Sequence, residues 1–521
     1  MDKQEYEGFK LTVSDTKRVI LSQQGISDVH KRSKGSNTVD NDAKHEKNGN
    51  VVVEQITMGK HVGLPSGISL IVGTIIGSGI FISPKSVLKD TGSIGLCLIV
   101  WAASGIIALF GGLVYAELGL VVKKSGGEYA YIREAFGNVP AFLFAWTSVV
   151  VIRTSSLSII CLTFAEYVDT FFEMCGQPEI PKKLVAALAI VTVALVNGYS
   201  TNLAARVQVV FTVAKLLALV VIIIGGIVKL AQGSRKELDT GFLDTNESPS
   251  TIALAFYGAL WAYDGWNNLN YVTEELQNPK RNLPIANITG VVLVTAVYIM
   301  TNISYFAVMT RQELLDAPAV AVLWGDRVIG AAAVLIPVAV MISTFGAANG
   351  TAFTANRVTY VAARDNNLPA ILSYIHYKNR TPLPSMIFTC TLSLMMIIPG
   401  NIGSLIDFFS FTAWMFYGMA FTALIVLRFT KKDAERPYKV PIPIPILMVL
   451  VALYLVIAPI VEEPRIEFLY ALLFVLGGLI FYVPFVHFNI KLKVVEYITI
   501  YLQLFLEVVP SPYVHEESEL N

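Results

Sequence analysis

From Gly63 onward the sequence alternates between long apolar blocks and short polar loops. Most blocks reach the ~20 apolar residues that a helix needs to cross ~30 Å of hydrocarbon. A helix is the expected element in each block, because it satisfies its own backbone hydrogen bonds in lipid. The pattern predicts an all-α membrane protein with twelve transmembrane helices, which we place roughly at 65–88, 94–118, 139–171, 184–200, 206–232, 250–270, 285–308, 331–362, 383–400, 404–428, 444–461 and 466–487.

The regions that flank these blocks are more polar. Residues 1–60 are rich in Ser, Asn, Gly and Lys, a composition that predicts a disordered cytosolic tail. The twelve-helix domain is expected at 61–489. Residues 490–521 are expected to form an amphipathic helix at the cytosolic membrane interface, followed by a short tail.

Composition and charge support this assignment. Of 521 residues, 54% are hydrophobic and 15% charged, whereas an ordinary soluble domain carries about 25% charged residues. The 39 Lys and Arg balance the 39 Asp and Glu, and this neutrality argues against a nucleic-acid partner, which would require a basic excess. Basic residues concentrate in the loops on one side, so the positive-inside rule places both termini in the cytosol.

Two of the predicted helices are interrupted by glycine. The first contains TIIGSGIF at 74–81, and the sixth contains GALWAYDGWN at 258–267. Interruptions at matching places in two halves of a chain are typical of transporters built from repeats. Breaking a helix exposes N–H groups that attract a carboxylate and C=O groups that attract an ammonium. Such a pair of ends suits the two charged groups of a free α-amino acid.

Each interruption also has a purely structural explanation. Gly-Ser-Gly in a membrane helix often forms a packing surface of small residues, and Trp261, Tyr263 and Trp266 are compatible with ordinary aromatic packing. Asp264 favours a binding site, because an ionisable side chain within a span costs at least ~2.5 kcal/mol and is a functional candidate. Around Asp264 the aromatic residues would then serve as pocket walls.

Several motifs between about residue 60 and residue 510 resemble a known family. They are GTIIGSGIF (73–81), YAELG (115–119), SGGEYAY (125–131), WAYDGWNNLNYVTEE (261–275), NPKRNLP (278–284) and ERPYKVP (435–441). With them the sequence is similar to the light subunits of heteromeric amino acid transporters, in the L-type family of the amino acid–polyamine–organocation superfamily. The type it resembles most is the b(0,+) system, which exchanges cystine, cationic and neutral amino acids.

The resemblance implies a leucine-transporter-type core of two inverted five-helix repeats, at about 65–232 and 250–428, followed by two further helices at about 444–487. It implies sodium-independent, obligatory exchange across the plasma membrane, by alternating access around a midplane site. No cofactor and no metal are expected. The expected partners are the lipid bilayer, a single-pass glycoprotein heavy subunit, and the substrates arginine, lysine, cystine and leucine-like neutral amino acids.

The resemblance also assigns roles at the interruptions. The substrate carboxylate would be held by the backbone amides of Gly77, Ser78 and Gly79. The α-amino group would be held by carbonyls near Ile75, Trp261 and Asp264, and Trp261 would close the site on its outer side. Asp264 stands where neutral-only members have a small uncharged residue, so its carboxylate would pair with a distal ammonium or guanidinium. Further residues expected in the substrate-binding site are Thr154, Tyr263, Asn267, Asn349 and Trp414.

Lys215 and Arg153 are two further charges within predicted spans. Lys215 would either extend to a membrane interface or, as the resemblance implies, occupy the place of the sodium ion bound by sodium-coupled relatives. The second role would account for sodium independence. For Arg153 two roles are open, as a part of the pocket or as a structural partner of Glu166 or Asp169.

Cys175 lies in the predicted outer loop between the third and fourth spans. A lone exposed thiol outside the cell tends to find an intermolecular partner. The resemblance implies that Cys175 forms the disulfide bond with the heavy subunit. The other three cysteines fall inside predicted spans, where we expect them to be buried small hydrophobes.

Other classes of function fit the sequence less well. An enzyme would need a nucleophile–base pair or a metal cluster, yet the six histidines lie in tails, loops or span ends. A channel would need rings of polar or charged residues, which Asp264 alone does not supply. A neutral-only exchanger of the same family, with Asp264 merely structural, is the main alternative.

Overall fold

The computed structural model describes residues 62–122, 126–172, 179–199, 201–379, 381–399, 401–462, 466–490 and 492–510, all within the unit Met58–Asn521. The longer helices are α2 (Leu64–Ile75), α3 (Gly79–Thr91), α4 (Ile94–Val122), α6 (Asn138–Thr147), α7 (Arg153–Asp169), α8 (Glu179–Tyr199), α9 (Thr201–Ala231), α10 (Pro249–Ala262), α11 (Pro279–Val308), α14 (Leu335–Arg364), α15 (Leu383–Ile397), α16 (Ile402–Thr430), α17 (Pro443–Glu462), α18 (Ile466–Phe481) and α19 (Lys493–Phe505). The shorter elements are α5 (Glu128–Phe136), α12 (Arg311–Asp316), α13 (Val320–Val328), the π-helical turns η1 (Ser148–Ile152) and η6 (Tyr482–His487), the 3-10 turns η2 (Leu238–Thr240), η3 (Asn268–Glu275), η4 (Gly330–Val334) and η5 (Ala370–Ser373), and the strands β1 (Tyr374–His376) and β2 (Val508–Pro510).

Each apolar block predicted from the sequence contains a helix. Within the described part of the chain, eight helices are long and apolar enough to cross a membrane, and nine if α2 and α3 form one bent span. The helices α10 and α15 have only 14 and 15 residues. The chain is therefore a multi-pass helical membrane protein, and the count of twelve spans stays a prediction.

The sixth predicted span differs most from the structure. We expected one helix over 250–270, but α10 ends at Ala262 and the chain continues through a turn into the 3-10 turn η3. Gly265 lies in this turn with a φ of 114°, a conformation that residues with a Cβ rarely adopt. The apolar pattern continues across the turn because these residues are buried in the protein, so it did not reveal where the helix ends.

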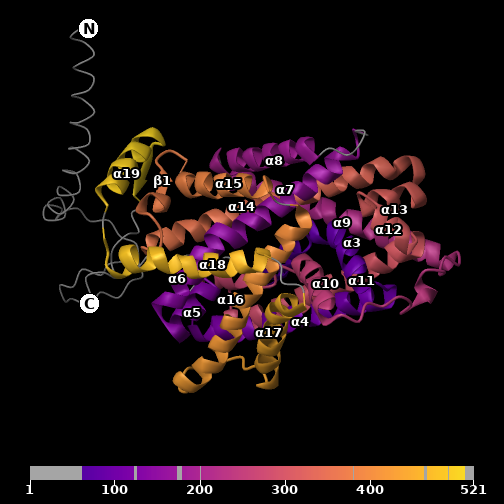
Figure 1. Cartoon of the computed structure of the whole chain (residues 1–521), viewed down its shortest axis with the longest axis horizontal. Helices are drawn as coiled ribbons and strands as arrows, with labels where there is room; N and C mark the ends of the chain where they lie inside the picture. Colours follow the sequence, from indigo (N-terminus) through magenta and orange to yellow (C-terminus); the bar gives the residue numbers. More distant parts are fainter. Residues whose placement is uncertain are drawn as a thin grey trace, which may run out of the picture. The chain divides into compact units, whose positions relative to one another are not determined.

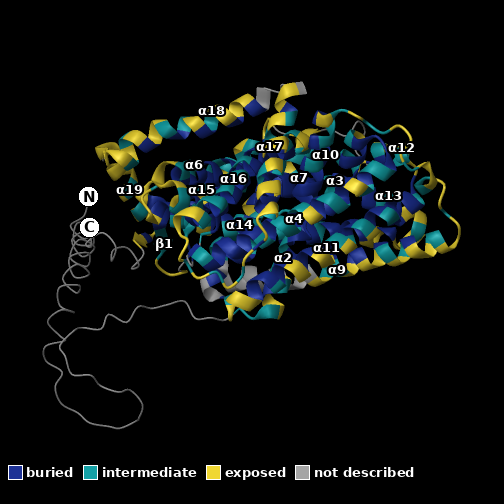
Figure 2. Ribbon diagram, turned by 90° about the horizontal axis from the view of Figure 1, so that it is seen from below, coloured by how far each residue is buried: buried dark blue, intermediate teal, exposed yellow. Residues whose placement is uncertain are grey.

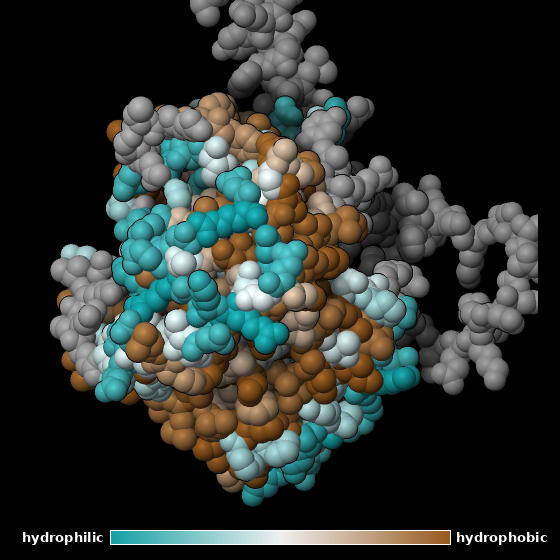
Figure 3. Space-filling model, turned by 90° about the vertical axis from the view of Figure 1, so that its right-hand side faces the viewer, coloured by the Kyte–Doolittle hydropathy of each residue, from teal (hydrophilic) through white to brown (hydrophobic). Residues whose placement is uncertain are grey.

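Large apolar side chains are exposed along the outer helices, as the bilayer requires. Exposed residues recur on α9, α17 and α18 (Figure 2). Among the exposed apolar residues of these helices are Leu217, Ile224, Leu450, Ile457 and Leu473. A water-soluble monomer rarely exposes apolar surface on this scale. Figure 3, which faces the end that carries α12 and α13, shows hydrophilic surface bordered by hydrophobic surface.

The opposite end carries α19 and the strands (Figure 1). The predicted amphipathic stretch at 490–508 forms the helix α19, whose side chains are largely exposed, and then β2, which pairs antiparallel with β1. Val508 is buried against Ile371 and Leu372. This pairing attaches the C-terminal segment to the connection between α14 and α15.

Two of the sequence motifs meet at a buried ion cluster. Glu117, in YAELG on α4, is fully buried and pairs with Arg428 of α16 and with Arg436 in the ERPYKVP motif. Its carboxylate also accepts a hydrogen bond from the backbone N–H of Val440, at 2.8 Å. The cluster thus joins α4, α16 and the connection to α17.

Candidate functional site

The two interruptions predicted from the sequence pack against each other. The helices α2 and α3 are separated by residues 76–78 and meet at an angle of 49°. A Cβ atom placed on Gly79, the first residue of α3, would lie 2.4 Å from Cα of Ala262, the last residue of α10. Only a glycine allows this approach. The glycine of the first break is therefore required for the contact with the end of α10.

The ends of these half-helices carry backbone groups that helix geometry leaves unpaired. The first N–H groups of α3 have no partner within the helix, and the side chain of Ser78 at its N-cap makes no capping hydrogen bond. At the carbonyl ends, the Tyr298 hydroxyl of α11 lies 2.8 Å from the Ile75 oxygen and 2.9 Å from the Ala262 oxygen. Since a carbonyl oxygen has two lone pairs, Ile75 keeps one for a further donor.

Lys215 lies at the carbonyl end of α2. Its Nζ is 2.5 Å from the backbone oxygen of Gly73, and the residue is only 1% exposed. The alternative of a lysine extending to a membrane interface is therefore wrong. The last turn of a helix carries partial negative charge, so the ammonium group occupies a position that would suit a cation.

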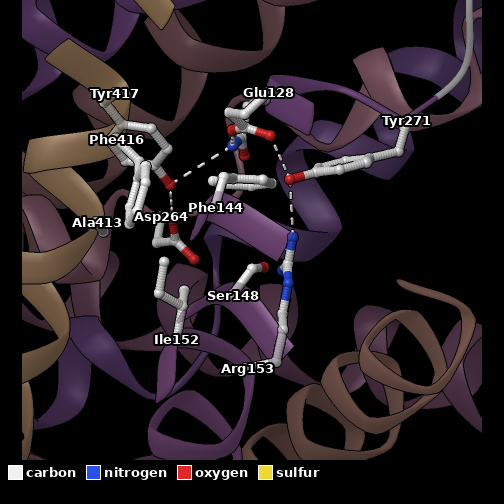
Figure 4. A pocket seen from close by; sticks show the side chains of 11 residues that line it. Glu128, Phe144, Ser148, Ile152, Arg153, Asp264, Tyr271, Ala413, Phe416 and Tyr417 are labelled. Atoms are coloured by element: carbon white, nitrogen blue, oxygen red, sulfur yellow. Dashed lines mark hydrogen bonds between the residues drawn. The ribbon is translucent and has the colours of Figure 1, made fainter. Parts of the chain in front are cut away.

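A small cavity opens beside the second interruption (Figure 4). It is lined by Glu128, Phe144, Ser148, Ile152, Arg153, Asp264, Asn267, Tyr271, Ala413, Phe416 and Tyr417. Two acids and a guanidinium group thus share one cavity.

A continuous chain of hydrogen bonds connects the charged groups of this cavity (Figure 4). The hydroxyl of Tyr417 donates to Asp264 Oδ1 at 3.0 Å and lies 3.5 Å from Asn267 Nδ2. The Asn267 amide donates to Glu128 Oε1 at 2.5 Å. The hydroxyl of Tyr271 donates to Glu128 Oε2 at 2.5 Å and accepts from Arg153 at 2.9 Å. Asp264 and the guanidinium group stand at opposite ends of this network.

The structure decides between the two roles left open for Arg153. Its guanidinium group lies in the cavity, whereas Glu166 and Asp169 both pair with Lys182 of α8. The expectation of a structural partner at Glu166 or Asp169 is therefore wrong. Arg153 directly follows the π-helical turn η1, which inserts an extra residue into the helical repeat and re-aims the side chains that come after it.

The remaining predicted residues lie in different places. Asn267 lines the cavity with Asp264, while Trp261 and Trp414 are buried and pack on Phe409 and Tyr417 respectively. Neither these two tryptophans nor Thr154, Tyr263 and Asn349 are among the residues that line the cavity, and their roles in binding stay predictions. Thr154 donates to the carbonyl of Val150 one turn earlier, Tyr263 donates to the Trp101 carbonyl of α4, and Asn349 accepts from Asn197 of α8.

Four residues that shape the site did not follow from the sequence reasoning. Glu128 stands in the quoted motif SGGEYAY, and Tyr417 stands one helical turn beyond Trp414, so both had a signal that could have been used. Tyr271 likewise stands in the quoted motif WAYDGWNNLNYVTEE, whereas Tyr298 had no signal, because tyrosines are common among packing aromatics. The predicted disulfide residue Cys175 lies outside the described residues.

Comparisons with known proteins identify the family of the chain. A family model described as amino acid permease matches residues 62–483. The b(0,+)-type amino acid transporter 1 of Mus musculus is 54% identical over 454 residues, which is 87% of this chain and 93% of that protein. The cystine/glutamate transporter of Homo sapiens is 40% identical over 463 residues, which is 88% of this chain and 92% of that protein. The large neutral amino acids transporter small subunit 2 of Mus musculus is 43% identical over 413 residues, covering 78% of each.

The matched region includes both helix interruptions and every residue of the cavity. The family and these relatives are transporters and not enzymes. The motifs quoted from the sequence, the paired helix breaks and the extent of the match lead to one assignment. The chain belongs to the amino acid permease family.

Proposed function

We propose that the protein is a sodium-independent, obligatory exchanger of cationic and neutral amino acids and cystine. The observation that carries the proposal is the cavity beside the second helix break, with Asp264 on its wall, together with the packing of that break against the first one. The relative described as b(0,+)-type amino acid transporter 1, at 54% identity, supports amino acid transport of this type. The cystine/glutamate relative supports cystine as a further substrate.

In this proposal the helix ends hold what all α-amino acids share. The amides of Gly77, Ser78 and Gly79 bind the carboxylate, because the start of α3 carries partial positive charge. The carbonyl ends near Ile75 and Trp261 bind the α-amino group. The Asp264 carboxylate then receives the distal ammonium or guanidinium group of a cationic substrate.

The proposed architecture is a leucine-transporter-type arrangement of twelve spans with alternating access in the plasma membrane. The end that carries α19 and β1 would face the cytosol, and the end with α12 and α13 would face outward. The basic loops and the positive-inside rule support this orientation. Both chain termini would then be cytosolic.

Counterflow into proteoliposomes tests the proposal directly. Labelled lysine, arginine, cystine, leucine and glutamate are offered outside, with unlabelled leucine or no amino acid inside. We expect uptake of the first four only when amino acid is present inside. Uptake that is undiminished with an empty interior would contradict exchange and would favour a channel.

Sodium independence is a separate prediction that rests on Lys215. A fixed ammonium group at the Gly73 carbonyl would supply the positive charge that a bound sodium ion provides elsewhere. We therefore expect equal leucine counterflow when sodium in the buffer is replaced by choline. A loss of most of the uptake in choline would contradict this role of Lys215.

We also propose that a single-pass glycoprotein heavy subunit binds through Cys175. Changing Cys175→Ser should remove a high-mass band that disappears on reduction when membranes of the native cell are run on a gel. Cys161→Ser is the matched control, because that thiol is fully buried. Persistence of the band in Cys175→Ser would indicate another linkage.

A neutral-only exchanger is the second candidate. It is favoured by the hydrogen bond from Tyr417 to Asp264, which gives the carboxylate a structural partner in the absence of substrate, and by the neutral amino acid transporter among the relatives. The same counterflow series separates the two. Exchange of leucine without lysine or arginine would support the neutral-only candidate.

A further inference from the structure

Glu128 is a buried acid that the proposed binding scheme does not use. It begins α5 within the motif SGGEYAY, is 1% exposed, and lines the same cavity as Asp264. A carboxylate is costly to bury unless it is paired or fully hydrogen-bonded. Its presence in the cavity therefore requires hydrogen-bond donors or a group of opposite charge nearby.

The nearby group of opposite charge is Arg153, held through a tyrosine. Both carboxylate oxygens of Glu128 accept hydrogen bonds at 2.5 Å, one from Asn267 and one from Tyr271. The Tyr271 hydroxyl in turn accepts from the guanidinium group, which also lies over the Tyr271 ring, 5.3 Å from its centroid. Tyr271 thus holds Arg153 by two contacts.

Asp264 on the other wall is left with a different environment. Its Oδ1 accepts from the Tyr417 hydroxyl, and the ion pairs found among the described residues do not include it. The two carboxylates and one guanidinium group sum to a formal charge of minus one. A cationic side chain beside Asp264 would bring the cavity to neutrality.

We propose that Glu128 is a positioning residue for substrate selectivity: through Tyr271 it holds Arg153 away from Asp264, and this leaves the Asp264 carboxylate free for a cationic substrate. The inference rests on the proposed function. Guanidinium groups bind carboxylates strongly and in a fixed geometry. Without the charge of Glu128, Arg153 would turn to Asp264, the other acid of the cavity, and would compete with lysine or arginine as substrate.

A purely structural role for Glu128 predicts a different result. If Glu128 only fixed the start of α5, its loss would lower transport of all substrates alike. The selectivity role predicts loss of cationic substrates with retention of neutral ones. The ratio of lysine to leucine counterflow in one preparation separates the two roles, because misfolded protein lowers both uptakes equally.

The experiment compares full-length variants in proteoliposomes loaded with leucine. Glu128→Gln should lower the lysine-to-leucine uptake ratio at least tenfold. The double variant Glu128→Gln/Arg153→Gln should restore this ratio to within about threefold of the wild type, because the competing guanidinium group is gone. Tyr271→Phe, which keeps the ring and removes only the bridging hydroxyl, should lower the ratio in the same direction. The matched control is Glu134→Gln on the same helix, whose carboxylate pairs with Lys431 at the surface.

Three outcomes would overturn the inference. An unchanged ratio in Glu128→Gln or in Tyr271→Phe, with wild-type lysine exchange intact, overturns it and leaves the proposed function standing. A double variant that keeps the low ratio of Glu128→Gln also overturns it, because competition by Arg153 is then not the cause. Absence of lysine–leucine exchange in the wild type overturns the proposed function and this inference with it.

Discussion

At the scale of single residues, the charges within the spans mark the site. Lys215 contacts a helix-end carbonyl, Arg153 stands on the wall of the cavity, and Asp264 stands on the wall opposite. Each would be costly in lipid without a partner or a substrate. We therefore expect single substitutions here to alter substrate range and ion dependence more than stability.

Asp264→Ala tests this at the proposed substrate acid. A hydrogen bond to a charged group contributes about 1.5–3 kcal/mol, and each 1.4 kcal/mol is about a factor of ten in affinity. We expect lysine and arginine counterflow to fall by at least about tenfold relative to leucine. Equal losses for lysine and leucine in Asp264→Ala would contradict a role in selectivity. Asp264→Asn keeps the shape of the side chain and removes only its charge, so this variant separates the effect of charge from the effect of side-chain volume.

At the scale of elements, the close contact between α3 and α10 determines the site. A helix start and a helix end are brought together because Gly79 has no Cβ to hold Ala262 away. The unwound segment that follows α10 then places Asp264 on the cavity wall. The interruption is thus a feature of packing between two helices as well as of each helix alone.

Alanine substitutions at two glycines of the first interruption test this contact. In Gly79→Ala the added methyl would lie 2.4 Å from Ala262 Cα, whereas in Gly77→Ala it would lie 3.6 Å from the nearest side chain, Ala347. We expect Gly79→Ala to lower the free energy of unfolding by about 1–3 kcal/mol, as overpacking does, and to reduce leucine counterflow. Thermal unfolding in detergent measures the first effect. A Gly77→Ala variant that is destabilised as much would contradict the packing argument.

At the scale of the whole molecule, buried polar clusters tie together helices far apart in the sequence. The Glu117 cluster joins residues 311 and 319 positions apart. Removal of one member of such a cluster leaves the others charged and unpaired in a buried place. The Glu117 cluster thus links α4 to α16 and to the connection before α17.

Glu117→Gln is the corresponding stability prediction. With Arg428 and Arg436 left without their buried carboxylate, we expect the free energy of unfolding to fall by about 3–5 kcal/mol. Glu134→Gln removes the exposed pair with Lys431 and should cost about 0–1 kcal/mol. Both are measured by thermal unfolding of the purified protein. Equal shifts in the two variants would show that burial of the Glu117 cluster contributes nothing.

The candidate site could be predicted only in part. The two interruptions and the unusual residues Asp264 and Lys215 are visible in the sequence, because glycine and charge stand out against an apolar block. The role of Arg153 could not be predicted from the sequence, because its hydrogen-bond partner Tyr271 is 118 residues away. Glu128 lay in a recognised motif, but its contacts with Tyr271 and Asn267 span 143 and 139 residues.

The sequence by itself determined the class of the protein, its helical blocks and the two glycine-containing interruptions, but not where α10 ends. These properties depend on the local run of apolar residues, glycines and charges, which the bilayer restricts to helices. Only the tertiary structure decided that the two breaks touch, that Lys215 caps a helix end, and that Arg153 and Asp264 lie at opposite ends of one hydrogen-bonded network. Those contacts arise from the packing of helices distant in sequence, and a linear pattern of polarity carries no information on which distant side chains become neighbours.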